Sequence, residues 1–312
     1  NSLLNRAALA GGGIDATSFG TIRLLAGAAM LAVLVLARHG ALTLGGPGRG
    51  AGVAGLFLYI YGFSAAYAGM PAGPGALLLF GMVQVTMFGG GLLGGEAIPA
   101  RRWIGAVLAF GGLVWLLWPG GGTAPSLPHA LAMLLAGFGW GIYSLTGRKA
   151  EVPLVAAAAN MVIAAGLGLL VQLGVMGAGQ VAADWSLSPV LLAVISGAVT
   201  SGLGYTLWYA LLPKIPGSVA AVAQLTVPVI AMAGGMIFLG EVLTARFVFA
   251  ALLVALDHGD ALVIVEHGRL RDIGRDADNQ FVHQLRAAFD DVHMPERDGI
   301  ESPRIDADPL GH

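Results

Sequence analysis

The sequence predicts an all-α polytopic membrane protein built as two inverted five-helix repeats, with about ten transmembrane helices of which the first and last are incomplete or irregular. Three observations predict this fold. The composition is apolar and poor in charge, a series of apolar stretches is long enough to cross a bilayer, and part of the first half recurs in the second half at a nearly constant spacing. The composition by itself excludes a soluble enzyme.

The composition leaves too little charge to cover a water-facing surface. Of the 312 residues, 56% are hydrophobic and 11% are charged, with a mean hydropathy of +0.79. Soluble domains carry roughly 25% charged residues. The 49 glycines follow no three-residue period, which excludes a collagen-like chain. Because there is no cysteine, disulfides, thiolate metal sites and cysteine nucleophiles are excluded as well.

Apolar stretches of transmembrane length follow one another along the chain. About 20 apolar residues in a helix cross the hydrocarbon layer, and backbone groups in lipid must find partners within their own segment. Two spans are incomplete. We interpret residues 1–10 as the second half of a helix, and residues 247–256 run into acidic sequence at Asp257. The eight complete spans are 17–37, 51–70, 73–95, 103–118, 127–145, 153–173, 189–212 and 218–239.

Charge divides the chain into a membrane body and a tail. Residues 1–256 carry ten Lys or Arg and five Asp or Glu, whereas residues 257–312 carry six and thirteen. We interpret 1–118 as the first repeat, 119–256 as the second, and 257–312 as an acidic polar tail that is disordered. Basic loop residues fall almost entirely on one side of the predicted bundle, which predicts that both termini are cytoplasmic. Those on that side are Arg38, Arg49, Arg101, Arg102, Arg148, Lys149 and Lys214, against Arg246 on the other.

An internal duplication relates the two halves. Residues 71–110 align without a gap on residues 216–255, and a second block matches at a slightly different offset. Since each copy contains five helices, an odd number, the second copy enters the membrane upside down. Inverted repeats of this kind are typical of secondary transporters, in which the halves alternately expose a central site. The matched residues include Pro71 and Pro216, Gly89-Gly90 and Gly234-Gly235, Gly95-Glu96 and Gly240-Glu241, Ser2-Leu3 and Ser144-Leu145, and Arg6 and Arg148.

These motifs resemble the EamA-type ten-helix permeases of the drug/metabolite transporter superfamily. The resemblance rests on the Gly-Glu ends of the fourth and ninth helices, on the Arg that follows each, and on Arg23 early in the second helix. It covers roughly residues 1–256. It implies a central cavity lined by helices one, three, four, six, eight and nine, in a family that includes YddG-like exporters of aromatic and other neutral amino acids.

Aromatic side chains inside the apolar spans are the first candidates for binding substrate. Tyr59 and Phe63 lie one turn apart and continue to Tyr67, so they predict an aromatic stripe on the third helix. The sixth helix carries Trp140 and Tyr143 beside Ser144, and in the eighth helix Tyr205 shares a face with Gly197 and Ser201. Helix packing is the alternative for each of these aromatic residues, with interface anchoring a further alternative for Tyr67 and Tyr209.

Two amides and one proline are further candidates. Gln84 and Gln224 can donate and accept hydrogen bonds to a solute, or can join helices to one another. Pro228 lies four residues after Gln224 and has no N–H, so the Gln224 carbonyl loses its helical donor. We expect either a broken helix that offers this carbonyl to an ammonium group, or a simple kink.

Charged and helix-bounding residues predict structural or gating roles. Arg23 lies near enough to a helix end to snorkel or to cap a neighbouring helix, and the alternative is that it binds a substrate carboxylate. Glu96 and Glu241 are expected to tie loops to helix ends. Pro71 and Pro216 bound helix pairs three-four and eight-nine, which we expect to swing as gates.

The predicted function is a secondary transporter that exports or exchanges small neutral metabolites, most plausibly aromatic and other apolar amino acids. No acidic residue falls at mid-membrane, so we expect exchange or facilitated movement without a built-in proton relay. The expected partners are a small neutral solute and the lipid bilayer, with no nucleic acid, cofactor or metal. Small residues four apart, such as Gly137 and Gly141, favour close packing within a monomer over dimerisation. The alternatives are a non-transporting sensor or assembly protein and, less favoured, an intramembrane enzyme.

Overall fold

The computed structural model describes residues 1–93, 111, 115, 125–179, 185–213, 217–242, 245, 248 and 249. Glu96, Pro216, most of the predicted spans 103–118 and 247–256, and the tail 257–312 lie outside the described residues, and the predicted repeat boundaries remain predictions. Within the described residues every regular element is a helix, as predicted. These are α1 (Ser2–Leu9), α2 (Ala16–His39), α3 (Arg49–Gly69), α4 (Ala72–Leu93), α6 (Leu127–Gly147), α7 (Pro153–Gly177), α8 (Leu187–Ile195), η1 (Ser196–Leu203), α9 (Gly204–Leu211) and α10 (Gly217–Leu239).

Six helical runs in the described residues are long and apolar enough to cross a membrane: α2, α3, α4, α6, α7 and the continuous run Leu187–Leu211. Local residues set where these helices begin and end. Asp15 caps α2 by accepting a hydrogen bond from the Ser18 N–H at 2.9 Å. The same helix ends at Gly40, whose φ of 69° is a left-handed conformation that glycine adopts without strain.

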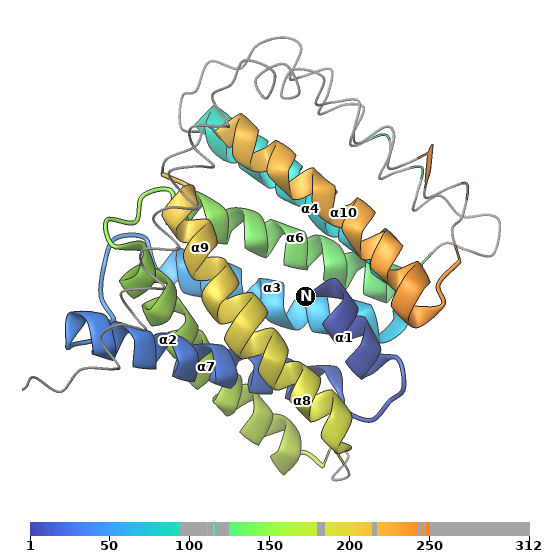
Figure 1. The fold of residues 1–312 in the computed structure, drawn as a ribbon, viewed down its shortest axis with the longest axis horizontal. Helices are drawn as coiled ribbons and strands as arrows, with labels where there is room; N and C mark the ends of the chain where they lie inside the picture. Colours follow the sequence, from blue (N-terminus) through green and yellow to red (C-terminus); the bar gives the residue numbers. More distant parts are fainter. Residues whose placement is uncertain are drawn as a thin grey trace, which may run out of the picture. The chain divides into compact units, whose positions relative to one another are not determined.

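Helices α3 and α6 lie side by side (Figure 1), and their backbones come almost into contact. A Cβ atom placed on Gly55 would lie 2.6 Å from the Gly139 carbonyl oxygen, and one on Gly139 would lie 2.5 Å from the Gly55 carbonyl oxygen. Gly62 makes the same kind of approach to the Ala132 carbonyl, also at 2.6 Å. Glycine is therefore required along this crossing. Gly137 brings α6 equally close to α4, which confirms that these small residues pack within the bundle.

The helices of the bundle pack in the pairs expected if a two-fold axis relates the two halves of the chain. Helix α2 packs against α7 and α4 packs against α10, as Figure 1 shows for α4 and α10. The matched residues Leu3 and Leu145 make similar contacts, displaced by one position: Leu3 packs over Gly234 of α10, and Leu145 packs over Gly90 of α4, next to Gly89, which is the residue matched with Gly234. These contacts agree with the predicted inverted repeat.

The predicted span 189–212 is not one regular α-helix. Helices α8 and α9 are joined by a π-helical segment, η1, in which Thr200 hydrogen bonds back to the Ser196 carbonyl. A π-helical turn widens the helix and changes the direction in which the following side chains point, and such turns recur at functional sites. No pattern in the sequence predicts this segment.

The helix ends gather into two groups. At the end that we name the Glu241 end, the termini of α1, α3, α4 and α10 meet, and the Ser186 N–H donates to the Gly13 carbonyl at 3.0 Å. At the opposite end, which we name the Arg49 end, the α2–α3 loop meets the α6–α7 loop beside Arg49. Among the described residues, the basic side chains at this second end are those of Arg38, Arg49, Arg148 and Lys149.

Candidate functional site

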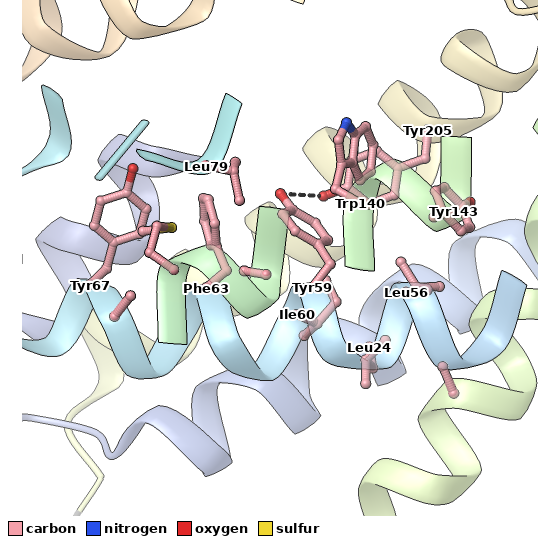
Figure 2. Close-up of a cluster of buried hydrophobic side chains, with 14 of the residues drawn as sticks. Leu24, Leu56, Tyr59, Ile60, Phe63, Tyr67, Leu79, Trp140, Tyr143 and Tyr205 are labelled. Atoms are coloured by element: carbon pink, nitrogen blue, oxygen red, sulfur yellow. Dashed lines mark hydrogen bonds between the residues drawn. The ribbon is translucent and has the colours of Figure 1, made fainter. Parts of the chain in front are cut away.

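Three aromatic side chains form a stripe along one side of α3 (Figure 2). The ring centroids of Tyr59 and Phe63 are 5.1 Å apart, and those of Phe63 and Tyr67 are 4.6 Å apart. All three rings are buried. The Tyr67 hydroxyl donates to the Ala72 carbonyl at 3.1 Å, so this tyrosine holds the turn between α3 and α4 instead of anchoring at the membrane interface. The predicted stripe is confirmed as geometry, while contact with a solute remains a prediction.

Side chains from the second half of the chain close on this stripe. The Trp140 ring of α6 lies 4.8 Å from that of Tyr59 and 4.7 Å from that of Tyr205 on α9. The Tyr205 hydroxyl donates to the Tyr59 hydroxyl at 3.0 Å, the bond drawn dashed in Figure 2. These residues are 4 to 8% exposed, so they are buried without being fully covered. With Phe63 and Tyr143 they form what we call the aromatic cluster, which joins both halves.

Tyr143 lies deepest in the aromatic cluster. Its ring is 5.5 Å from Trp140 and 4.5 Å from Tyr209, and the side chain is fully buried. Its hydroxyl has no hydrogen-bond partner among the described residues. A buried hydroxyl without a partner carries a desolvation penalty of about 1–3 kcal/mol, so a polar group that reached it would bind favourably.

Gln224 links α10 to the aromatic cluster. The Trp140 Nε1–H donates to the Gln224 side-chain oxygen at 2.7 Å, and the Gln224 side-chain nitrogen lies 3.9 Å from the sulfur of Met87. The predicted joining of helices by Gln224 is confirmed by this interhelical hydrogen bond, while its binding of a solute remains a prediction. Gln84 on α4 is half-buried, and its assignment to the site remains a prediction.

The expected break at Pro228 is absent. Helix α10 continues as one α-helix through the proline, which is buried. Proline removes one helical hydrogen bond at a cost of about 3 kcal/mol. Packing of α10 along the length of α4 outweighs that cost, so the helix is not divided. The first of the two alternatives, a broken helix, is therefore wrong, and the simple kink within a continuous helix is the alternative that remains a prediction.

The expected snorkelling of Arg23 is also wrong. Its side chain is 0% exposed and points into the bundle, with its guanidinium carbon 5.3 Å from the Tyr59 ring centroid and 5.2 Å from that of Phe63. Nε donates to Ser201 Oγ at 2.9 Å, and Nη2 donates to the hydroxyls of Tyr205 at 2.6 Å and Tyr59 at 3.2 Å. Hydroxyl acceptors and aromatic faces hold the cation inward, because they replace part of its hydration.

The π-helical segment η1 brings the partners of Arg23 into place. A Cβ atom on Gly197 would lie 2.2 Å from the Arg23 carbonyl oxygen, so only glycine permits this approach of η1 to α2. One turn further on, Ser201 reaches the guanidinium, and Tyr205 reaches it from the start of α9. The predicted common face of Gly197, Ser201 and Tyr205 is confirmed, and it faces α2.

Glu241 closes the end of the bundle that bears its name. Both carboxylate oxygens accept from the Ala72 N–H at 2.9 Å, which caps the start of α4, and Arg6 Nε lies 3.7 Å from the carboxylate. Arg6 also donates to the Tyr67 carbonyl at 3.2 Å. The expected tie from Glu241 to a helix end is confirmed, although the helix is α4. Pro71, which precedes this cap, is exposed.

A cavity of about 160 Å³ lies at the Arg49 end, between the α2–α3 loop, the α6–α7 loop, α7 and α9. Arg49 spans one wall: it donates to the carbonyls of Leu44 at 3.0 Å and Ala156 at 2.7 Å, and to the Asn160 side-chain oxygen at 2.7 Å. Asn160 in turn donates to the Tyr209 hydroxyl at 3.1 Å. This network fastens the loop to α7 and α9.

Sequence reasoning missed Asn160 and Met87. A polar residue in the middle of apolar α7 was a usable signal for Asn160, since lipid offers an amide no partner. Met87 gave no such signal, because methionine fills core positions throughout membrane helices.

Comparisons with known proteins agree with this geometry. The sequence profile of the EamA-like transporter family matches residues 127–256. The "Uncharacterized protein PA1977" of Pseudomonas aeruginosa is 46% identical over 256 residues, which cover 81% of this chain and 86% of that protein. The "Threonine/homoserine exporter RhtA" of Salmonella typhimurium is 31% identical over 176 residues, 54% of this chain and 58% of the exporter.

One solved crystal structure shares the fold. It superposes with a TM-score of 0.63 over 84% of this chain and 94% of the other, at 21% sequence identity. The likeness extends over nearly the whole of that chain, so the described helices follow an arrangement already known in an experimental structure.

Proposed function

Because the chain belongs to the EamA-like transporter family of the drug/metabolite transporter superfamily, we propose that it exports or exchanges aromatic and other apolar amino acids. Its family and its apolar helices indicate a multi-pass protein of the bacterial inner membrane, and a transporter rather than an enzyme. The identity of the solute is the part that we infer from the site.

The observation that carries the proposal is the aromatic cluster. Tyr59 from the first half and Trp140 and Tyr205 from the second lie within 6.0 Å of one another, ring centroid to ring centroid. An apolar side chain stacks favourably on such rings, with about 0.5–1.5 kcal/mol per aromatic pair beyond the buried area. The amide of Gln224 at the cluster edge adds donors and acceptors for the polar part of an amino acid.

Alternating access would use the two ends of the bundle in turn. In the described conformation, Glu241, Ala72 and Arg6 bind one another at one end, whereas the opposite end holds the cavity beside Arg49. The basic residues gathered at the Arg49 end favour a cytoplasmic position for that end and for both termini. The expected gating role of Pro71 is consistent with its place beside the Glu241 contact.

Exchange without a proton relay remains our expectation for the coupling. The acidic side chains among the described residues are Asp15, Glu151 and Glu241, and each lies at a helix end or in a loop. None of them faces the aromatic cluster in the described contacts. Transport driven by a proton gradient needs a titrating group on the path, and the described part of the path offers none.

Counterflow tests the proposal. Liposomes containing the purified chain are loaded with unlabelled phenylalanine, and uptake of labelled phenylalanine, leucine, threonine, aspartate and lysine is measured. We expect exchange of the neutral amino acids and little exchange of aspartate or lysine. Trp140→Ala should abolish exchange, while the matched control Trp185→Ala, at an exposed position, should not. Lack of exchange with every solute would contradict a transport role and would favour a sensor or assembly protein.

A further inference from the structure

Arg23 is a cation in the interior of the bundle with no acidic partner in the described residues. It is fully buried, and its hydrogen-bond partners among the described residues are the hydroxyls of Ser201, Tyr59 and Tyr205. Hydroxyl dipoles replace only part of the hydration that a guanidinium loses on burial, so burial without a counter-ion is costly. Within the part of the chain that the structure describes, the positive charge beside the aromatic cluster therefore has no acidic counter-ion.

The described acids are committed elsewhere. Asp15 caps α2, and Glu241 binds the Ala72 N–H beside Arg6. Glu151 is exposed and borders the cavity at the Arg49 end. Each of these carboxylates already has a place away from the guanidinium, so the described part of the chain supplies no counter-ion to Arg23.

The guanidinium also has unused donor capacity. Nη1 of Arg23 is buried and has no hydrogen-bond partner among the described residues. The same is true of the Tyr143 hydroxyl, in the same aromatic cluster. Each such group costs about 1–3 kcal/mol while it lacks a partner. The guanidinium carbon lies 5.3 Å from the Tyr59 ring centroid and 5.2 Å from that of Phe63, so the free donor is next to the rings assigned to the solute.

We propose that Arg23 binds the α-carboxylate of the transported amino acid. A carboxylate is the ligand group that supplies both missing features, negative charge and oxygen acceptors matched to a guanidinium. This assignment rests on the proposed function. It requires the solute to carry a carboxylate, so that the part of the solute bound by Arg23 is negatively charged. Ser201 and Tyr205 then act by orienting Arg23 through their hydrogen bonds.

The test uses solutes that differ only at the carboxylate. Inhibition of phenylalanine counterflow by the full-length wild-type chain is measured with unlabelled phenylalanine, phenylalaninamide and phenylalanine methyl ester. We expect the amide and the ester to inhibit roughly 30-fold more weakly than the acid, a ratio that corresponds to about 2 kcal/mol. Equal inhibition by acid and amide in the wild type would overturn the assignment of Arg23 while leaving amino-acid transport intact.

Variants separate a binding role from a purely structural one. Arg23→Gln should remove the preference for the acid, and Arg23→Lys should recover part of it, because a lysine keeps the charge without the fork geometry. Arg49→Gln is the matched control: it also removes an arginine that joins helices, and it should keep the full preference. A preference that survived Arg23→Gln would overturn the proposal.

Ser201→Ala tests the proposal independently if the Arg23 variants fail to fold. It leaves the charge of Arg23 in place and removes one hydrogen bond, so we expect a preference reduced about threefold. An unchanged preference in this variant, with an unchanged thermal midpoint, would show that Ser201 does not orient Arg23. If no amino acid drives counterflow in the wild type, the proposed function fails and the assignment fails with it.

Discussion

Arg23 and Arg49 each join helices in this bundle, and the hydrogen bonding of their guanidinium groups differs. Every nitrogen of the Arg49 guanidinium has an acceptor: the carbonyls of Leu44, Gly45 and Ala156, and the side-chain oxygen of Asn160. Arg23 is buried more deeply, yet its Nη1 has no acceptor among the described residues. Arg49 holds a loop in place, whereas Arg23 retains capacity to bind.

This difference gives a way to distinguish a structural arginine from a ligand-binding arginine in a membrane protein. Burial already separates the two, because Arg23 is fully buried inside the bundle whereas Arg49 is half-buried at its end. The hydrogen bonds also differ: Arg49 donates mostly to backbone carbonyls and has an acceptor for every nitrogen, whereas Arg23 donates only to side-chain hydroxyls among the described residues. Substitutions at the two regions should therefore have different consequences.

The largest effect is expected where the Arg23 region would be forced apart. Gly197→Ala places a methyl group 2.2 Å from the Arg23 carbonyl oxygen, so η1 must move away from α2. Overpacking of this kind costs about 1–3 kcal/mol. We expect counterflow to fall at least about tenfold, together with a lower thermal midpoint. Gly204→Ala is the control on the same helix, where the nearest atom lies at 3.9 Å.

A smaller effect, on stability alone, is expected at the other arginine. Arg49→Ala removes the hydrogen bonds that tie the α2–α3 loop to α7, and bonds from a charged donor to a partly exposed acceptor justify a loss of about 2 kcal/mol. The thermal midpoint in detergent should fall by several degrees, while the ratio of phenylalanine to phenylalaninamide inhibition stays at the wild-type value. A change in that ratio would remove the distinction between the two arginines.

Glu241→Gln should act on the equilibrium between conformations. The amide keeps one acceptor for the Ala72 N–H and loses the charge that faces Arg6 and the start of α4, an effect of about 1 kcal/mol. Ala76 is fully buried one turn into α4, and because the chain has no cysteine, a single Ala76→Cys reporter can be labelled with a maleimide when this end opens. We expect labelling about fivefold faster than with Glu241 intact. Glu151→Gln, at the opposite end, should leave the rate unchanged.

The smallest effect is expected from a variant that tests the role of the Gln224 side-chain amide. Trp140→Phe keeps an aromatic ring in the cluster and loses the N–H that donates to Gln224 at 2.7 Å. Hydrogen bonds between membrane helices average about 0.6 kcal/mol, so the half-saturating phenylalanine concentration should rise about threefold. Trp208→Phe loses the comparable bond to Ser144 outside the cluster, and it should not raise that concentration.

Much of the fold could be predicted from the sequence because the bilayer imposes a length on each span. The long helices α2, α3, α4, α6 and α7 fall where the apolar stretches predict them. The interruption at η1 could not be predicted, since a π-helical turn depends on how closely Gly197 meets α2 and not on a local motif. The continuity of α10 through Pro228 likewise depends on packing against α4.

The site was predictable in its aromatic part and not in its charged part. Helical spacing alone aligned Tyr59 with Phe63, and the contact with Trp140 follows from the crossing of α3 and α6. The direction of Arg23 depends on hydroxyls supplied by α9 and η1, more than 170 positions later in the chain. A long flexible side chain near a helix end gives no sequence signal for pointing inward, so the snorkelling prediction failed there.

The glycine crossing of α3 and α6 constrains what can move during a transport cycle. With Gly55 and Gly139 so close that no methyl group fits between the backbones, neither helix can slide or rotate past the other without a steric clash. Tyr59 and Trp140, which these two helices carry, should keep their 4.8 Å separation in every state. One wall of the binding space would then be an invariant platform, and the solute would be released by departure of the opposite wall.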